Sequence, residues 1–540
     1  MSRSDMMARL LRMARLAERC GQTGESPQEV VDREAPGSEG RRNFAKGVVA
    51  ASTAAAAWSL APGAWATDRI GMKPRAPRLS GNVAVVGAGI AGLACANELT
   101  RLGINARLFE ASDRVGGRIA SLRDVFPGQV VERGAEFIGS SHHTMLGYAR
   151  ELGLALESYS APVGDTFYHF GGSRYSEAQV VAEYREFTAS IRQDIGTLGS
   201  PTADRFKESD ALLDYMSIDD YLDLHGAGSL LRRVIRSAYL AEYGAGIDEL
   251  SAISFLRFIH GDPRSKQAPF GVNGGGMVRV LDGNDRITSG LAERLPMPPM
   301  LDHRLVAMRK QSGGMIRLTF DVGGRRMDSD HHAVVMTLPF SVLRDVEMHS
   351  SLQLPAWKSL AIKSTDMGSH SKLMVGFNGA MWRQQHGLSG SGYSDLPGVQ
   401  ATWESNPSRA TPSSAVLTGY FGGQRAQAMT AASTQADAGA FLANLERVMP
   451  GATQAASRDA RGQFVAYTEN WASNPLSKGS HSTNRPGYFT NTAHHEGKAV
   501  GNLVFAGEHT SSFYEWQGFM EGAALSGLRA ASEVLALAEA

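Results

Sequence analysis

Residues 82–110 restrict most strongly what this chain can fold into. A short apolar run over 82–86 is typical of a buried parallel strand, and a second such run over 106–109 ends at Glu110. Between these runs the chain reads Gly87-Ala88-Gly89-Ile90-Ala91-Gly92 and continues with apolar residues at helical spacing. The segment therefore predicts a strand, a glycine turn, a helix and a second strand that ends in an acid.

The glycines and the acid have separate physical roles in such a unit. Gly87 permits the tight turn, Gly89 lets a pyrophosphate approach the backbone, and Gly92 lets the helix pack closely on the strand. The free N–H groups at the helix N-terminus attract the phosphates. Glu110 stands where an acid accepts hydrogen bonds from ribose hydroxyls, which argues against the 2′-phosphate of NADP. We therefore expect a dinucleotide site.

Charge and cysteine content exclude several classes of protein. Lys+Arg and Asp+Glu are both 54, and this zero net charge argues against a nucleic-acid partner bound through a basic domain. Cys20 and Cys95 are the only cysteines among 540 residues, which excludes a disulfide framework, a cysteine zinc site and an iron–sulfur cluster. The histidine pairs at 142–143 and 494–495 predict no metal site, because neighbouring side chains diverge.

Six further segments carry short motifs in a fixed order. They read ASDRVGGRI at 111–119, ERGAEFIG at 132–139, GGGMVRVLDGNDRI at 274–287, AVVMTLP at 333–339, LVFAGEH at 503–509 and WQGFMEG at 516–522. In content and order, these motifs resemble those of the flavin-containing amine oxidase superfamily. The resemblance runs from the glycine turn to the C-terminal helix.

The resemblance implies an α/β fold built from two interleaved domains. We expect a Rossmann-like FAD-binding domain assembled from discontinuous segments, over residues 80–150, 268–340 and 479–540. An α+β substrate domain is expected over 151–267 and 341–478. The first of its two segments has apolar residues at helical spacing, whereas the second has strand-like runs.

The resemblance also implies which residues hold FAD. They are Gly87, Ala88, Gly89, Ile90, Ala91, Gly92, Glu110, Ala111, Arg118, Gly134, Ala135, Glu136, Phe137, Leu305, Trp471, Gly507, Glu508, Gly518, Phe519 and Met520. The N-terminus of the final helix would stabilise negative charge on the reduced flavin. Ser480 stands where some family members attach the flavin through a cysteine, so we expect noncovalent FAD.

The implied reaction is oxidative deamination of an amine, with a hydride passing to flavin N5 and hydrogen peroxide forming from O₂. Lys372 matches the family's strand lysine, which holds a water near N5; the alternative is a lysine that faces solvent. His481 and Phe519 match the positions of the amine cage, and Trp516 is also assigned to the catalytic site. His481 replaces the usual tyrosine, which argues against simple monoamines.

Three other readings stay open from the sequence. An L-amino-acid oxidase of the same superfamily needs an arginine that clamps a carboxylate, and the first insert offers Arg232, Arg233 and Arg236 without a matching motif. A periplasmic dehydrogenase would use another electron acceptor, and a flavin-binding module would have no oxidase activity.

Glu515 either pairs with the distal ammonium of a polyamine or is a solvated loop acid. A monomer and a homodimer are both open.

The N-terminal region carries a second resemblance. Arg41, Arg42, Phe44 and Lys46 precede an uncharged stretch over 47–66, and the whole resembles a twin-arginine export signal. We expect the twin-arginine machinery to be a partner, the enzyme to be periplasmic or secreted, and cleavage to follow Ala66. The alternative is an uncleaved anchor, but the stretch is rich in small residues and lacks the apolarity of a spanning helix.

Residues 6–20, MMARLLRMARLAERC, form an amphipathic pattern with arginines on one face. Such a pattern is also typical of a helix that lies on a membrane surface. We favour the simpler interpretation, in which these residues are a long extension of the export signal and are discarded with it.

Overall fold

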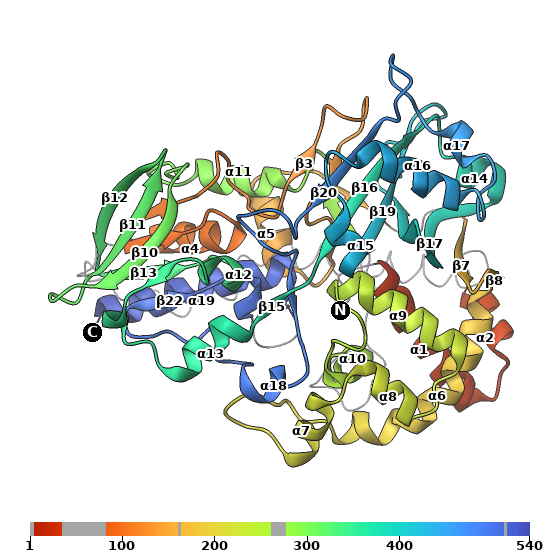
Figure 1. Cartoon of the computed structure of the whole chain (residues 1–540), viewed down its shortest axis with the longest axis horizontal. Helices are drawn as coiled ribbons and strands as arrows, with labels where there is room; N and C mark the ends of the chain where they lie inside the picture. The colour runs from red at the N-terminus through yellow and green to blue at the C-terminus, as the bar shows by residue number, and fades with distance from the viewer. Residues whose placement is uncertain (1–4, 35–82, 160–163, 261–276, 512–515, 540) are drawn as a thin grey trace, which may run out of the picture.

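The computed structural model describes residues 5–34, 83–159, 164–260, 277–511 and 516–539 (Figure 1). The twin-arginine motif at Arg41 and Arg42 lies outside the described residues, as does Glu515. Within the described ranges, no helix is both long and apolar enough to cross a membrane.

A four-stranded parallel sheet forms the centre of the cofactor side, in the order β2-β1-β13-β22. Its strands are β1 (Val83–Val86), β2 (Ala106–Phe109), β13 (Ala333–Met336) and β22 (Leu503–Phe505). Val83 and Val85 of β1 pack toward helices α4 (Ile90–Arg101) and α19 (Met520–Glu539), whereas Ala84 and Val86 pack on the other face. This alternation follows from the two-residue repeat of a strand and explains why β1 is apolar throughout.

The second face of that sheet is covered by an antiparallel meander. The meander contains β10 (Arg304–Lys310), β11 (Ile316–Val322) and β12 (Arg325–His331), and β14 (Glu347–Met348) pairs with β10. Phe320 of β11 stacks on Phe109 of β2 with ring centroids 4.4 Å apart, so the meander joins the core of the sheet. Helices α12 (Phe340–Leu343) and α13 (Ala356–Ser364) complete this layer.

The substrate side is built on a seven-stranded sheet in the order β20-β16-β19-β18-β17-β7-β8. Its strands are β7 (Asp165–Phe170), β8 (Ser173–Tyr175), β16 (His370–Phe377), β17 (Leu388–Leu396), β18 (Val399–Glu404), β19 (Ala415–Gly422) and β20 (Ala466–Asn470). The helices that follow these strands are α14 (Met381–His386), α15 (Gly423–Ala428), α16 (Thr434–Leu445) and α17 (Ala452–Ala455). Every residue of β16 is buried, as expected for a central strand that is covered on both faces.

A group of helices lies below this sheet in Figure 1. It contains α6 (Glu177–Thr197), α7 (Glu208–Tyr215), α8 (Ile218–Leu224), α9 (Ser229–Tyr243) and α10 (Ala252–His260). Two N-terminal helices, α1 (Asp5–Thr23) and α2 (Pro27–Glu34), pack into the same group and share its hydrophobic core. This position differs from our expectation that residues 6–20 are only an appendage of the export signal; their removal stays a prediction.

Two strand pairings extend the cofactor side past the expected domain boundaries. β6 (Leu156–Ser158) pairs with β9 (Met277–Val280), and β14 pairs with β10. Residues 156–158 and 347–348 therefore belong with the cofactor side, because strand pairing depends on partners that are distant in sequence. The other boundaries stay predictions.

The remaining elements are short. They are β3 (Ser121–Leu122), β4 (Val131–Glu132), β5 (Ile138–Gly139), α5 (His143–Glu151), α11 (Asp285–Glu293), η1 (Ser350–Leu352), β15 (Asp366–Met367), β21 (Ser482–Thr483), α18 (Tyr488–Asn491) and η2 (Glu508–Thr510). β15 pairs with β21 and so connects the start of β16 to the segment that leads into β22.

Candidate active site

A cavity of about 510 Å³ lies between the parallel sheet and the seven-stranded sheet. One part is lined by the carboxyl ends of β1 and β2 and by the N-termini of α4 and α19. The other part is lined by side chains of β16, β18 and β19. The carboxyl ends of parallel strands are where open α/β sheets bind ligands, so the fold places this cavity at an expected site.

The glycine turn leaves room for a phosphate group. A Cβ on Gly92 would lie 1.9 Å from the carbonyl oxygen of Gly87, so α4 packs directly against the turn. A Cβ on Gly89 would meet no atom within 4 Å, and Gly89 lines the cavity. No side chain caps the N-terminus of α4, so its N–H groups are available to an anion.

Glu110 lies at the end of β2, beside the turn. Its carboxylate accepts hydrogen bonds from the backbone N–H of Ala88 at 2.7 Å and from the N–H of Ser112 at 2.9 Å. Glu110 is nearly buried but lines the cavity, where its carboxylate could bind ribose hydroxyls. The open turn and this acid fit the pyrophosphate and ribose of a dinucleotide.

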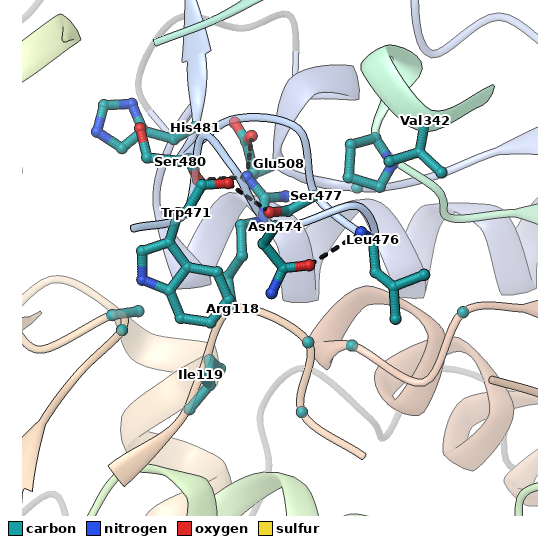
Figure 2. A pocket seen from close by; sticks show the side chains of 18 of the residues that line it. Arg118, Ile119, Val342, Trp471, Asn474, Leu476, Ser477, Ser480, His481 and Glu508 are labelled. Carbon is teal, nitrogen blue, oxygen red and sulfur yellow. Dashed lines mark hydrogen bonds and ion pairs between the residues drawn. The ribbon is translucent and has the colours of Figure 1, made fainter. Parts of the chain in front are cut away.

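Arg118 ties three segments of the cavity wall together. Its guanidinium donates to the carbonyl oxygen of Ser480 at 2.6 Å and to Glu508 Oε1 at 2.9 Å, as Figure 2 shows. Glu508 also accepts from the hydroxyl of Ser482 at 2.7 Å and from the N–H of Gly518 at 2.8 Å. Burial by itself raises the pKa of Glu508, but Arg118 and the other partners hold it below its usual value. Arg118 is thus a fixed cation beside the N-terminal turn of α19.

Lys372 is enclosed at the substrate side of the cavity. Its ammonium donates to the carbonyl oxygens of Glu132 and Gly134, each at 2.9 Å, and to Glu136 Oε2 at 2.7 Å. The other oxygen of Glu136 accepts from Tyr159 Oη at 2.8 Å and from Trp403 Nε1 at 3.1 Å. Lys372 is only 6% exposed, so it does not face solvent, which was the alternative considered from the sequence.

A row of rings forms the wall next to Lys372. His370 stacks on Tyr420 with centroids 4.8 Å apart, and His481 lies 4.7 Å from His370. Trp403 lies 5.2 Å from Tyr420 on the neighbouring strand. Together with Phe519, these rings line the cavity and form a largely apolar slot for a small organic substrate.

Comparison with known proteins identifies the architecture. The profile of the flavin containing amine oxidoreductase family matches residues 90–535, which is most of the chain. The chain belongs to the flavin-containing amine oxidoreductase family. It is therefore a flavoenzyme that uses FAD to oxidise amines.

Individual relatives agree with this assignment. The chain is 28% identical to the flavin-containing monoamine oxidase AofH of Mycobacterium tuberculosis over 470 residues, which cover 84% of this chain and 97% of that protein. An L-amino-acid oxidase of Siganus canaliculatus is 24% identical, with 84% of this chain and 85% of that protein covered. The solved structure of cyclohexylamine oxidase from Brevibacterium oxydans shares the fold, with a TM-score of 0.72 at 22% identity, covering 86% of this chain and all of that one.

The FAD of this amine oxidoreductase is held without a covalent bond to cysteine. The two cysteines, Cys20 in α1 and Cys95 in α4, are both buried in hydrophobic cores, and neither is among the described residues that line the cavity. Burial also raises the pKa of the Cys95 thiol above the usual range, which keeps it unreactive. Ser480 lines the cavity.

The cavity brings together most of the residues predicted to hold FAD. Those that line it are Gly87, Gly89, Ile90, Ala91, Glu110, Ala111, Arg118, Gly134, Ala135, Glu136, Phe137, Leu305, Trp471, Gly507, Glu508, Gly518, Phe519 and Met520. Ala88 and Gly92 are not among the lining residues: Ala88 donates its N–H to Glu110, and Gly92 packs against the turn. The individual roles of all these residues toward FAD stay predictions.

Of the predicted catalytic residues, Lys372, His481 and Phe519 line the cavity. Trp516 is not among the lining residues; its ring packs edge-on against Phe519, with ring centroids 6.1 Å apart. His142 packs edge-on against both rings, and burial lowers its pKa to about 4, so it is neutral at ordinary pH. Trp516 thus contacts a residue of the wall, and the catalytic roles predicted for all four residues stay predictions.

Three residues of the site escaped the sequence analysis: His370, Trp403 and Tyr420. Tyr420 pairs in register with Lys372 across β16 and β19. Trp403 is on β18, which is the next strand of the sheet. Alternating apolar residues in these strands were a visible signal, but the register that places the rings beside the lysine exists only in the folded sheet.

The histidine pairs lie in different environments. His494 and His495 both approach Asp204, His495 at 2.9 Å, and His142 is buried against Trp516. Among the described residues, no group of three or more possible metal ligands comes together.

Proposed function

We propose that the substrate is an amine without a carboxylate next to the reacting carbon. Among the described residues, four arginines line the cavity: Arg114, Arg118, Arg133 and Arg304. Backbone carbonyls hold Arg114, Glu508 holds Arg118 and Asp321 holds Arg304. Arg133 pairs with Glu469 through Nη1, while its buried Nε keeps no partner, so Arg133 is the described arginine to which the second candidate would look. This pairing carries the proposal, because an amino-acid substrate needs a guanidinium that can bind its carboxylate with two parallel hydrogen bonds.

The three arginines considered from the sequence do not change this proposal. Arg232, Arg233 and Arg236 lie on α9, where they pair with Asp223, Asp395 and Asp219 respectively. None of them is among the lining residues of the cavity. Amino-acid oxidation remains the second candidate, favoured by the likeness to the Siganus canaliculatus enzyme.

The reaction that we propose converts a primary amine, O₂ and water into an aldehyde, ammonia and hydrogen peroxide. FAD, when bound, would accept the two electrons that leave the α-carbon–hydrogen bond of the substrate as a hydride, while the amine nitrogen loses a proton. The ring slot of Tyr420, His481 and Phe519 would hold the substrate carbon and exclude bulk water. Oxidation gives an imine, which then reacts with water to release the aldehyde and ammonia.

Lys372 is proposed as the residue that positions water in this reaction. Its ammonium is anchored by two carbonyl oxygens and Glu136, so the side chain cannot turn to solvent. These three acceptors use all three N–H groups of the ammonium, so a water molecule would bind Lys372 by replacing one of the two carbonyl oxygens, and the fixed charge would stabilise negative charge nearby. The carboxylate of Glu136 is held in turn by Tyr159 and Trp403, which keeps the pair in place.

A substrate panel on the purified, FAD-loaded protein tests the substrate class. We expect peroxide formation with primary amines that carry apolar or aromatic groups, and at least about tenfold lower kcat/KM for L-amino acids of the same side chain. Matched pairs such as benzylamine-type and phenylglycine-type compounds differ only in the carboxylate. Higher kcat/KM for the amino acids would reject the amine proposal in favour of the second candidate.

The flavin absorbance of the same samples identifies the electron acceptor. We propose O₂ as the acceptor, so anaerobic addition of an amine should bleach the flavin absorbance and admission of air should restore it within seconds. Restoration only after addition of an artificial acceptor would indicate a dehydrogenase. An unchanged flavin spectrum with every amine and amino acid would indicate a binding module.

We also propose that the protein is exported through the twin-arginine route to the periplasm or beyond it. The support is the Arg41-Arg42 pair, followed by Phe44, Lys46 and the uncharged stretch over 47–66. Cell fractionation of the unaltered chain and of an Arg41→Lys/Arg42→Lys variant tests this. We expect the unaltered protein in the periplasmic fraction and the variant in the cytoplasm; the same cytoplasmic location for both would reject export by this route.

A further inference from the structure

We propose that the N-terminal helical hairpin, α1 and α2, is a part of the folded substrate domain. In this proposal the hairpin is bound to α6 and α9 in the FAD-loaded chain before any export, and it stays bound where that chain is cut within residues 35–82. The proposal does not depend on which substrate the enzyme uses. It assigns the hairpin neither to a membrane surface nor to a discarded signal.

The apolar face of α1 is covered by the protein itself. Met13, Ala14, Leu16, Ala17 and Cys20 are each at most 1% exposed. They belong to the same hydrophobic core as the helices of the first insert, and Val30 adds the apolar face of α2 to it. A helix that waits for a lipid surface would present this face to solvent.

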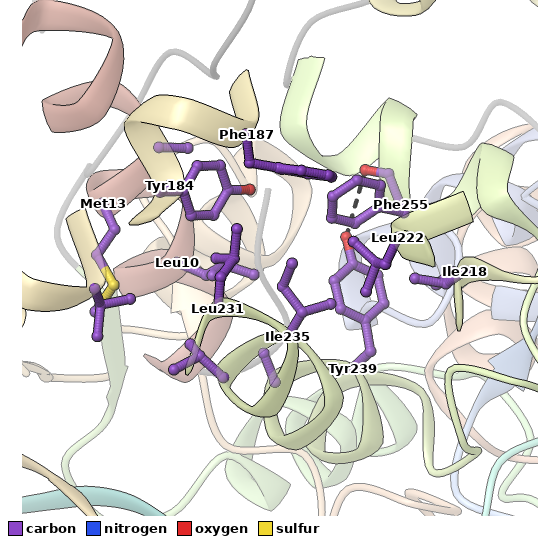
Figure 3. Packing of buried hydrophobic residues seen from close by; sticks show 14 of the residues in the cluster. Leu10, Met13, Tyr184, Phe187, Ile218, Leu222, Leu231, Ile235, Tyr239 and Phe255 are labelled. Carbon is purple, nitrogen blue, oxygen red and sulfur yellow. Dashed lines mark hydrogen bonds between the residues drawn. The ribbon is translucent and has the colours of Figure 1, made fainter. Parts of the chain in front are cut away.

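Figure 3 shows the packing at the centre of this contact, with Leu10 and Met13 of α1 beside Tyr184 and Leu231. Tyr184 comes from α6 and Leu231 from α9, and both are fully buried. Figure 1 shows α1 alongside both helices. Removal of the hairpin would therefore expose a contiguous apolar surface, which a soluble domain of this size rarely tolerates.

Charged residues on the flanks of α1 match partners on α6. Arg12 donates to both oxygens of Glu177, at 3.0 and 3.1 Å, near the start of α6. Arg192, near the end of α6, donates to both oxygens of Glu18 at 2.9 and 2.8 Å. Two such pairs of opposite polarity define one orientation of α1 on α6, whereas an unspecific apolar contact would not.

The hairpin also supports the active site through α9. The carbonyl oxygen of Ala241 in α9 lies 3.0 Å from His370 Nε2, and His370 stacks on Tyr420 in the cavity wall. A Cβ on Gly422 would lie 2.2 Å from the carbonyl oxygen of Leu240, so α9 contacts β19 backbone to backbone. α9 is thus held between α1 on one side and the strands of the cavity on the other.

The proposal is tested on the full chain with a site-specific protease sequence inserted after Ala66, the expected end of the export signal. The FAD-loaded protein is cut to completion, as verified by intact mass, and passed over a size-exclusion column without denaturant. We expect the fragment that contains α1 and α2 to co-elute with the remainder, with unchanged flavin absorbance and melting temperature. Separate elution of the fragment would overturn the proposal, whether or not the remainder keeps its flavin. The inserted chain without protease is the control.

A pair of lysine variants tests the contact without any cut. Ala17 is fully buried against the first insert, whereas Gln22 is exposed five residues later on the same helix. We expect Ala17→Lys to lower the melting temperature by at least about 5 °C and Gln22→Lys to change it by less than about 1 °C. Equal melting temperatures for the two variants would overturn the proposal. The readout is the flavin fluorescence on heating, which needs no substrate.

Discussion

Glu136 shows how a single residue organises the catalytic end of the cavity. One of its carboxylate oxygens accepts from Lys372, and the other accepts from Tyr159 and Trp403. Glu136 is only 4% exposed, so these partners contact its carboxylate in place of water. Breaking a buried ion pair by removing one partner typically costs about 3–5 kcal/mol, because the other charge is left uncompensated.

We predict that Lys372→Met lowers the free energy of unfolding by about 3 kcal/mol and that the double variant Lys372→Met/Glu136→Gln recovers part of this loss. The recovery is expected because glutamine carries no charge that needs the ammonium. Guanidinium unfolding of the FAD-loaded proteins measures both effects, and Lys310→Met on the exposed end of β10 is the control. Strictly additive effects of the two substitutions would contradict the proposed coupling.

Glu132 is a second buried acid whose environment has a measurable consequence. Burial raises its pKa from 4.5 to about 7, although it accepts hydrogen bonds from Asn284 and Ser121. A carboxyl with a raised folded-state pKa binds its proton more tightly in the folded protein than in the unfolded chain. Its contribution to stability is complete below pH 4.5 and is lost as the pH rises through about 7.

We predict that the unaltered protein loses about 3 kcal/mol relative to Glu132→Gln as the pH rises from about 4.5 to 8. Glutamine resembles the protonated acid and has no proton to lose, so the stability of the variant lacks this pH-dependent loss. Unfolding curves at several pH values give the difference, with Glu151→Gln, an exposed acid, as the control. Parallel pH profiles for the protein and Glu132→Gln would show that Glu132 is ionised in the fold at all these values.

At the scale of elements, α4 depends on two glycines with different neighbours. The packing of α4 on the turn requires Gly92, since a Cβ there would lie 1.9 Å from the Gly87 carbonyl oxygen. The space in front of the helix requires Gly89, which has an ordinary φ of −71° and an open cavity beside it. Gly92 therefore serves the packing of the fold, whereas Gly89 is predicted to serve the ligand.

Alanine substitutions should separate these two roles. We predict that Gly92→Ala lowers the melting temperature of the FAD-free protein, whereas Gly89→Ala leaves it unchanged and weakens FAD binding by at least about tenfold. Thermal unfolding and titration of the apoprotein with FAD measure the two quantities. Gly196→Ala in α6, where a Cβ meets nothing within 4 Å, is the control and should stabilise slightly. Unchanged FAD affinity in Gly89→Ala would show that the glycine turn does not bind the phosphates of FAD.

At the scale of the whole molecule, the cavity joins parts of the chain that are far apart in sequence. Its wall includes the turn after β1, the strand pair β16 and β19, and the first turn of α19. A ligand that fills this space contacts both sides of the enzyme at once. Binding to the folded state alone stabilises a protein by mass action, to about 4 kcal/mol at a thousandfold excess over Kd.

We predict that removal of FAD lowers the melting temperature by at least about 5 °C and that added FAD restores it. NADP should have no such effect, because Glu110 is predicted to bind ribose hydroxyls and its carboxylate would repel a 2′-phosphate there. Differential scanning fluorimetry of the apoprotein with each nucleotide makes the comparison. An equal rise with NADP would contradict the role of Glu110.

Much of the cofactor side could be read from the sequence because its signals are local. The strand, the glycine turn and the acid at 110 lie within one short segment, and they have the predicted arrangement. Lys372, which its strand motif singled out, lines the cavity, whereas Trp516 is not among the lining residues, because a sequence motif does not reveal which side of a turn faces the cavity. The catalytic roles of both residues stay predictions.

The sequence by itself determined the backbone of the dinucleotide site, since glycine geometry and helix ends depend on near neighbours along the chain. It also determined the order of the motifs that mark the family. Only the tertiary structure decided that Tyr420 lies beside Lys372, that the arginines of the cavity are already paired, and that α1 is buried against α6 and α9. The physical reason is the same in each case: strand register, ion pairing and core packing join residues whose separation along the chain carries no information about their distance in space.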